Sequence, residues 1–272
     1  MSHNQVWIET YSNNTPFFTP APVVSTPDPA AVARSAAPLR LLVCPAGDDD
    51  RSDAYADFTT MLAARLDAAI MLITADTTLS SNAAATDLLL YHEPSQPRLS
   101  RWLFGPPACF EAAQSSRSLL VIRQPRPTLR NILFISRGQA KDMAAAEWVS
   151  RCALPPETRI TALAVQPHLS GMDSRALYND GLTDWLNSRT PLGDQLRKIA
   201  RRLPHHPIDE HLRLTILPGQ PHRQIKQAVA IGQPDLIVMS ADSTNWCERR
   251  LLGELVDPLL HWADRPVLIA KN

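Results

Sequence analysis

The chain lacks an excess of charge of either sign. Its 272 residues carry 27 Lys and Arg against 27 Asp and Glu, so the formal net charge is +0 at pH 7. A neutral chain offers no electrostatic attraction for the phosphates of nucleic acid or for an anionic membrane surface. We therefore expect neither nucleic acid nor a membrane among its partners.

The features of secreted and membrane proteins are also missing. The four cysteines form no C-x-x-C pair, and a chain of this length needs no disulfide framework. The first residues do not combine a basic region with an apolar one, as a signal peptide would. No run approaches the roughly 20 apolar residues that span a membrane. We expect a cytoplasmic protein with free thiols.

Known catalytic and metal-binding motifs are absent as well. The sequence contains no G-x-S-x-G, H-E-x-x-H or P-loop. The segment 205–211 is rich in histidine and acid but has no recognised ligand spacing, so we interpret it as a solvent-exposed linker. Cys247 lies close to two arginines, which favours a thiolate, yet an ordinary position at the start of a helix is the better explanation. We expect neither an enzyme nor a metal site.

The chain does contain a proline-rich segment at residues 1–37. It shows no helical or strand periodicity, and each proline removes a backbone donor and restricts the preceding residue. We predict a disordered tail. The tail is a candidate contact for an unidentified protein partner, because it contains the aromatic residues Trp7, Tyr11, Phe17 and Phe18.

From residue 39 onward, apolar segments alternate with helical ones. We predict strands over residues 39–44, 68–74, 87–91, 118–123, 131–136, 159–165, 211–217, 235–239 and 266–271. We predict helices over residues 53–66, 104–113, 141–151, 178–186, 191–202, 221–231 and 248–262. Apolar strands separated by helices indicate a parallel α/β sheet covered on both faces. The last five strands predict a five-stranded, doubly wound sheet.

The two halves of this pattern resemble each other. RLLVCPAGD (40–48) matches NILFISRGQ (131–139), and DLLLYHEPS (87–95) matches DLIVMSADS (235–243). Each half ends in a related strand, SLLVIR or PVLIAK. Three matches in the same order indicate an internal repeat.

The repeat predicts two domains, at residues 38–125 and 129–272. In the first domain a much shorter segment separates the opening strand from the second motif. We therefore predict a truncated copy that lacks a helix, a strand and a helix. The last strands of both copies, near 118–123 and 266–271, are expected to lie at the contact between them.

The second half resembles the universal stress protein family. Domains of that family open with a strand that leads to Asp-Gly-Ser. They close with Asp-Leu-Ile-Val-Met, G-x-x-G-x9-G-[S/T] and a Pro-Val-Leu-Val-Val strand. The corresponding residues here are Arg137-Gly138-Gln139, Asp235–Met239, Ser240-x-x-Ser243, Gly253-Glu254 and Pro266–Ile269, and the G-x-P before a helix is matched at Gly219. The resemblance covers residues 38–272 and implies two Rossmann-like units with mainly parallel five-stranded sheets, the first unit being truncated.

The resemblance also implies an ATP site, in which glycines admit phosphate to backbone N–H groups. In the second domain Arg137 replaces the family's Asp, and Glu254 places a carboxylate where phosphate would lie. Two like charges a few ångströms apart repel by about 1–4 kcal/mol at surface-like dielectric. The first domain departs further from the motif, with Ala46, His92, Ser95 and Pro106 at the equivalent positions. We therefore predict that both sites are degenerate.

These observations favour a non-enzymatic protein of stress response or regulation that acts through protein–protein interaction and needs no cofactor. One alternative is a sensor that binds ATP or another adenine nucleotide in the second domain. Its binding residues would be Arg137, Gly138, Gly219, Ser240, Ser243, Gly253 and Glu254. Another alternative is a structural protein that assembles into larger homo-oligomers.

Overall fold

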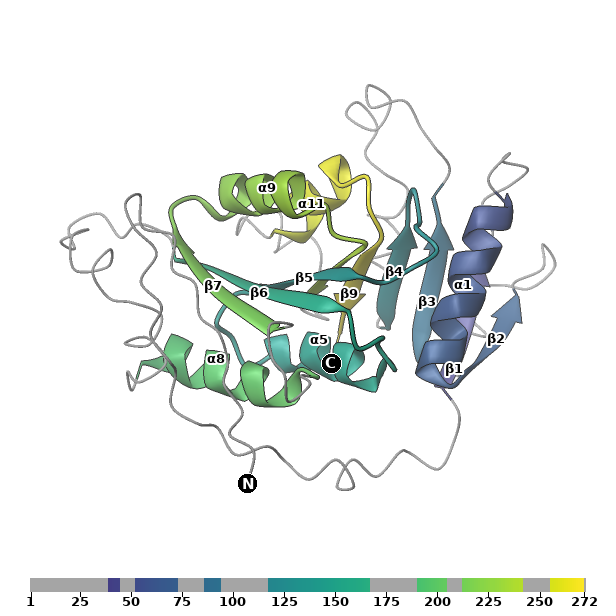
Figure 1. Ribbon diagram of the computed structural model, residues 1–272, viewed down its shortest axis with the longest axis horizontal. Helices are drawn as coiled ribbons and strands as arrows, with labels where there is room; N and C mark the ends of the chain where they lie inside the picture. Colours follow the sequence, from purple (N-terminus) through teal and green to yellow (C-terminus); the bar gives the residue numbers. More distant parts are fainter. Residues whose placement is uncertain are drawn as a thin grey trace.

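The structure is a computed structural model, and it describes residues 39–44, 52–72, 86–93, 117–166, 190–204, 212–241 and 255–271. Within these residues the chain forms one nine-stranded sheet with helices on both faces (Figure 1). In chain order the elements are β1 (Leu39–Cys44), α1 (Ser52–Leu66), β2 (Ala68–Leu72), β3 (Leu88–His92), β4 (Ser118–Ile122), β5 (Asn131–Ser136), α5 (Asp142–Arg151), β6 (Arg159–Gln166), α8 (Pro191–Arg202), β7 (Leu212–Pro218), α9 (Pro221–Gly232), β8 (Leu236–Ser240), α11 (Val256–Trp262) and β9 (Val267–Ala270). All nine predicted strands are present. The predicted tail and the predicted helices at 104–113 and 178–186 lie outside the described residues.

The strand order is β2-β1-β3-β4-β9-β8-β5-β6-β7. All neighbours from β5 to β9 within the second half pair in parallel, as do those from β1 to β4. The order β9-β8-β5-β6-β7, with the first strand in the middle, is the doubly wound arrangement. The predicted five-stranded parallel sheet of the second half is therefore confirmed.

The two parallel sets meet at an antiparallel pair, β4 and β9, in which Leu120 lies opposite Leu268. The predicted position of these last strands at the contact is confirmed. The contact does not separate two sheets, however, but joins both sets into one. Each last strand is the edge of its own set, and pairing the two edges satisfies backbone N–H and C=O groups that would otherwise lack partners.

Equivalent contacts recur in the two halves at the positions that the motifs align. The backbone N–H of Asp87 donates to the carbonyl of Arg40 at 3.0 Å, and the amide of Arg40 donates to the Asp87 carboxylate at 2.9 Å. Asp235 and Asn131 repeat both hydrogen bonds, at 2.8 and 2.9 Å. The repeated motif thus builds the same local structure twice. That the first half is a shortened copy of the second remains an interpretation.

Helices cover both faces of the sheet and explain why the strands are apolar throughout. On one face α1, α5 and α8 pack against one large cluster, and on the other α9 and α11 pack against a second (Figure 1). Successive side chains of a strand point to opposite faces. In β1, Leu41 accordingly joins the first cluster and Leu42 the second.

The last helix is shorter than predicted. Leu255 is the N-cap of α11, so the helix begins at Val256, and residues 248–254 lie outside the described residues. Pro258 then falls in the first turn, where backbone N–H groups have no partner within the helix and a proline costs little. A helix running continuously from residue 248 would have placed this proline in its interior.

Candidate functional site

Doubly wound sheets bind ligands at the carboxyl ends of their strands, at the point where the strand order reverses. In the second half this switch point lies between β5 and β8. Arg137 directly follows β5, and Ser240 is the last residue of β8. The structure therefore brings together two of the residues that the sequence predicted for the site.

A carboxylate that the sequence pattern did not indicate, Asp142, organises this edge. Asp142 is the first residue of α5, and its exposed fraction is 0%. Its Oδ2 accepts hydrogen bonds from the Ser136 hydroxyl at 2.9 Å and from the backbone N–H groups of Arg137 and Gln139 at 2.8 and 3.1 Å. Its Oδ1 accepts from the Ser240 hydroxyl at 2.9 Å. The carboxylate thus ties the ends of β5 and β8 to α5.

The position of Asp142 follows from the electrostatics of α5. The N-terminus of a helix carries partial positive charge and N–H groups without helical partners, so it favours an anion. External phosphates use the same environment in many nucleotide sites. Here a side chain of the chain itself supplies the anion. An acidic residue in the first turn of a helix that follows a strand is a weak sequence signal, because it also occurs as an ordinary helix start.

Arg137 lies across the same strand ends. Its Nη2 donates to the carbonyl oxygen of Ser240 at 3.0 Å, and its side chain is half-buried. Ser240 corresponds to a glycine of the family motif, and in the structure it is a buried strand residue with 1% exposure. At the switch point, therefore, the Ser240 carbonyl is bonded to Arg137 and the Ser240 hydroxyl to Asp142.

Gly138 packs its loop against α8. Its φ is 70°, a left-handed conformation that favours glycine, and a Cβ there would lie 2.6 Å from Cδ1 of Leu192. The helix beginning there is capped by Thr190, whose hydroxyl accepts from the Gly193 N–H at 3.2 Å. Close packing against Leu192 is thus sufficient to account for this glycine.

The remaining predicted residues are not part of this cluster. Gly219, with a φ of 119°, follows the edge strand β7, which β6 separates from β5. Ser243, Gly253 and Glu254 lie outside the described residues. So do Cys247 and the histidine-rich segment 205–211. Within the residues that the structure describes, no three His, Cys, Asp or Glu side chains gather in a way that would hold a metal ion.

The equivalent edge of the first half carries His92, the last residue of β3. Its ring stacks on Tyr55 with centroids 5.0 Å apart, and its Nε2 lies 3.0 Å from the Thr59 hydroxyl. Burial lowers the pKa of His92. Tyr55 and Thr59 both belong to α1, the first helix of this half. In both halves, therefore, a side chain at the end of this strand is bonded to the helix that packs beside it.

A buried ion pair of Glu93 and Arg123 lies next to His92. Arg123 follows β4, and its Nε donates to Glu93 Oε2 at 2.7 Å. Its Nη1 donates to the carbonyls of Leu260 and Ala263 at 2.6 and 2.8 Å, at the C-terminal end of α11. A cation is favourable at a helix C-terminus. The pair therefore links the first half to the second.

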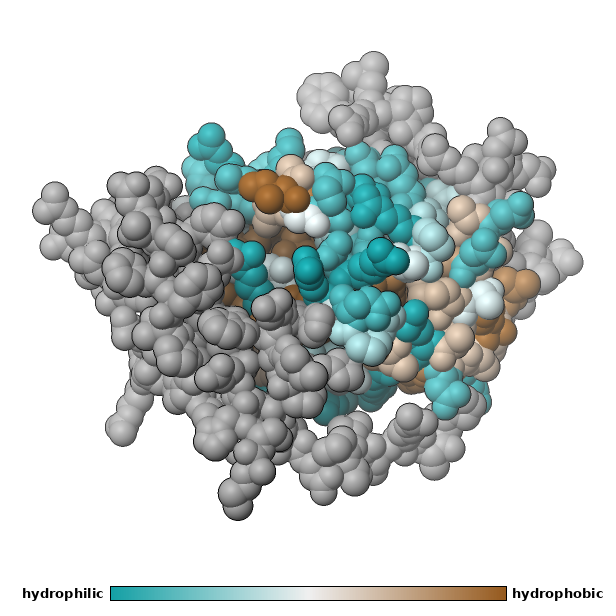
Figure 2. Space-filling view, in the orientation of Figure 1, coloured by the Kyte–Doolittle hydropathy of each residue, from teal (hydrophilic) through white to brown (hydrophobic). Residues whose placement is uncertain are grey.

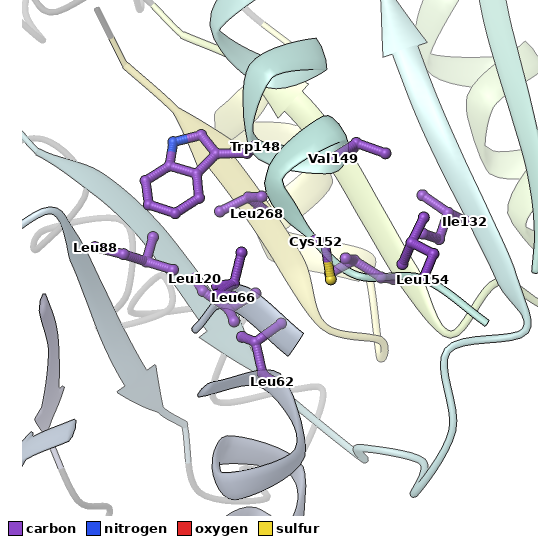
Figure 3. A pocket seen from close by; sticks show the side chains of 11 residues that line it. Leu62, Leu66, Leu88, Leu120, Ile132, Trp148, Val149, Cys152, Leu154 and Leu268 are labelled. Atoms are coloured by element: carbon purple, nitrogen blue, oxygen red, sulfur yellow. The ribbon is translucent and has the colours of Figure 1, made fainter. Parts of the chain in front are cut away.

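The antiparallel pair of β4 and β9 forms the seam between the two halves. A small apolar cavity lies beside this seam, between α1 and α5 (Figure 3). Its volume is about 20 Å³. It is lined by Leu62, Leu66, Leu88, Leu120, Ile132, Trp148, Val149, Cys152, Leu154, Leu236 and Leu268. Burial raises the pKa of the Cys152 thiol to about 12, so at neutral pH it is an unreactive thiol. No group of polar side chains converges on the cavity, and we interpret it as a packing defect.

The same seam is closed by hydrogen bonds. The Trp148 indole N–H donates to the Ser118 hydroxyl at 2.9 Å. The backbone N–H of Ala153 donates to the carbonyl of Arg65, and Arg65 Nη1 donates back to the carbonyl of Ala153, both at 2.8 Å. Strand β4 and helix α1 of the first half are thus bonded to α5 and to the segment that follows it in the second half. No helix in the described part of the chain has the length and apolar character needed to cross a membrane.

Comparisons with known proteins agree with this geometry. The model of the Universal stress protein family matches residues 128–271. A universal stress protein from Archaeoglobus fulgidus DSM 4304 superposes with a TM-score of 0.54 at 10% identity, covering 85% of this chain and 96% of that one. A functionally unknown protein from Pseudomonas aeruginosa PAO1 has a TM-score of 0.51 at 14% identity, covering 86% and 82%.

A third solved structure is a universal stress protein in complex with cAMP, with a TM-score of 0.36 at 12% identity, covering 52% of this chain and 95% of that one. No curated protein matches the sequence. The structural likenesses establish the α/β fold, while the family model spans more than half of the sequence. The chain therefore belongs to the universal stress protein family.

Proposed function

We propose that this chain acts in the cytoplasm, in stress response or regulation, by binding protein partners, without catalysing a reaction and without ATP as a cofactor. The proposal rests on the switch point between β5 and β8, where side chains of the chain itself already bond to the strand ends. Asp142 and Arg137 hydrogen-bond there to the ends of both strands. The aromatic segment 1–37 is the candidate contact for a partner.

The hydrogen-bond donors at the end of β5 are already used within the chain. An anionic ligand bound at the loop after β5 would take hydrogen bonds from the backbone N–H groups of that loop. Two of these, from Arg137 and Gln139, already donate to Asp142. A phosphate would have to displace a buried carboxylate and leave it near a second negative charge, which is unfavourable.

The other end of the family motif has lost its hydroxyl group in both halves. Glu254 stands in the sequence where the family has Ser or Thr, and Pro106 stands at the equivalent position of the first half. Neither residue supplies the hydroxyl donor of the family pattern. Loss of the donor in both halves supports a function that does not depend on ATP.

The experiment is a titration of the full chain with ATP. We expect millimolar ATP to leave the melting temperature unchanged and calorimetry to detect no binding. A ligand at 100 times its dissociation constant would stabilise the fold by about 2.7 kcal/mol. In a chain of this size that gain would raise the melting temperature by a few degrees.

A gain-of-binding variant sharpens the test. Arg137→Asp with Glu254→Ser restores the family residues at both ends of the motif, and we expect it to bind ATP more tightly than the unaltered chain. The control is Arg223→Asp with Glu157→Ser, which makes the same charge changes at exposed positions away from the switch point. Micromolar ATP affinity of the unaltered chain would overturn the proposal.

The second candidate function is a sensor of ATP or another adenine nucleotide. The location of Gly138 favours it, since this residue with positive φ lies between β5 and the N-terminus of α5, where phosphates often bind. Under this hypothesis Ser240 and the loop amides would exchange Asp142 for the ligand. The same calorimetric titration decides between the two functions.

A further inference from the structure

In the part of the chain that the structure describes, one edge of the sheet is apolar and has a strand on one side only. β2 ends the sheet, and among the described residues it pairs only with β1. All five of its residues are apolar, in the sequence AAIML. Ile70 is 41% exposed and Leu72 is 68% exposed. Figure 2 shows apolar side chains gathered over this edge of the molecule.

The strand of the second half that is equivalent to β2 is β6, and it is not an edge strand. There β6 lies between β5 and β7, and the outer strand is supplied by the chain segment between β6 and β8. In the first half only residues 73–87 connect β2 to β3. A further parallel strand would need a crossover of about a dozen residues on each side. That connection is therefore too short to supply a parallel outer neighbour for β2, as β7 does for β6.

The edge also lacks the usual protection against pairing. Natural edge strands carry lysine, proline, bulges or inward-pointing charges that discourage another strand from adding. Residues 68–72 include no charged residue and no proline. The opposite edge, β7, carries Arg213 and buries Leu212 and Leu214. β2 is therefore the edge suited to accept another strand.

We propose that β2 pairs with β2 of a second copy of this chain, antiparallel and around a two-fold axis. Centred on Ile70, this pairing places Ala68 opposite Leu72 and Ala69 opposite Met71 of the other copy. Small residues then face large ones, and no like charges face each other within the strand. Two-fold dimers are the commonest closed assemblies. The chain already joins two parallel sets by an antiparallel edge pair, β4 with β9.

The first test is the mass of the full chain in solution. Light scattering should give twice the 30.1 kDa of one chain. Ile70→Lys places two positive charges opposite each other at the axis and should give a monomer with an unchanged circular dichroism spectrum. Ile231→Lys is the matched control, because Ile231 is 75% exposed but lies on α9. This variant should remain a dimer.

The second test uses the symmetry of the pairing. In the proposed dimer, residue 70 of one copy lies opposite residue 70 of the other. Ile70→Lys and Ile70→Glu should therefore each be monomeric alone and form a dimer when mixed in equal amounts. A surface covered by the tail of the same chain, or by a different protein, would not respond to mixing. A monomeric unaltered chain, a dimeric Ile70→Lys variant, or a mixture that stays monomeric would each overturn the proposal.

Discussion

Buried polar side chains at the ends of strands connect distant parts of this chain. Asp142 is fully buried and accepts hydrogen bonds from four donors. Burying a charge is costly unless hydrogen bonds replace its water. Arg123 meets the same requirement with a carboxylate and two helix carbonyls. Each of these residues depends on partners that lie far away in sequence or at the end of another element.

The buried imidazole of His92 predicts an acid-sensitive contribution to stability. Burial lowers the pKa of His92 below its ordinary value of 6.5, so the unfolded chain binds a proton there more readily than the folded chain. This contribution is therefore present above pH 6.5 and is lost as the pH falls below 6.5 towards the folded pKa. The slope for one proton is at most about 1.4 kcal/mol per pH unit. Urea unfolding at a series of pH values measures it.

The matched variant is His92→Gln, which keeps a polar group near the Thr59 hydroxyl but does not titrate. We expect the unaltered chain to lose more stability than this variant between about pH 7 and pH 5. Parallel stability curves for the two proteins would contradict the assignment of this effect to His92.

Among the helices and loops, the residues at helix ends and turns determine where each helix begins and what it packs against. The loop after β5 turns at Gly138, because only a residue that tolerates positive φ can approach Leu192 there. α11 begins late, which leaves Pro258 in its first turn. The close approach at Gly138 brings α8 against the loop at the carboxyl end of β5.

Two glycines predict opposite effects of the same substitution. Gly138→Ala should lower the free energy of unfolding by about 1–3 kcal/mol, because alanine is strained at positive φ and would press on Leu192. Gly232→Ala should raise it by up to about 1 kcal/mol, since this helical position has nothing within 4 Å of the new Cβ. Chemical denaturation measures both variants.

Adding Leu192→Ala to Gly138→Ala separates the two causes. The second substitution relieves the steric contact but not the backbone strain, so its own cost should be smaller in the Gly138→Ala background than in the unaltered chain. Shifts of the same sign for Gly138→Ala and Gly232→Ala would contradict the explanation.

At the scale of the whole molecule, the antiparallel seam holds two parallel sets of strands as one sheet. Backbone pairing of β4 with β9 forms its centre. The ion pair of Arg123 and Glu93 flanks it on one side, and the contacts of Trp148 and Arg65 flank it on the other. Because the seam contains both backbone and side-chain bonds, we expect the described halves to unfold together.

Removing the cation at the seam should be costly. Arg123→Met leaves the Glu93 carboxylate buried and deprives the carbonyls of Leu260 and Ala263 of a donor. We expect a loss of about 3–5 kcal/mol in the free energy of unfolding, the usual effect of removing one partner of a buried ion pair. Denaturant unfolding followed by tryptophan fluorescence measures the loss.

The control is Arg197→Met, which removes the partner of the exposed Asp194 and should cost at most about 1 kcal/mol. Adding Glu93→Gln to Arg123→Met should recover part of the loss, because no charge then remains buried. Equal costs for the Arg123 and Arg197 variants would show that the buried pair does not hold the seam.

The parallel five-stranded sheet and the family could both be predicted from the sequence. Strand and helix periodicity is local, and the motif 235–239 repeats a family pattern in a short segment. The same patterns located Arg137 and Ser240 at the edge of the sheet. They did not reveal Asp142, because its role arises only where β5, β8 and α5 meet.

Only the fold shows that the two parallel sets form one sheet and that β2 is an edge strand among the described residues. Both outcomes depend on which edges face each other, and strands of equal apolar character compete for the same backbone bonds. It also decided that Arg123 joins the end of β4 to the end of α11, 137 residues further along the chain. Such pairs leave no local signal, because their partners become neighbours only when the chain folds.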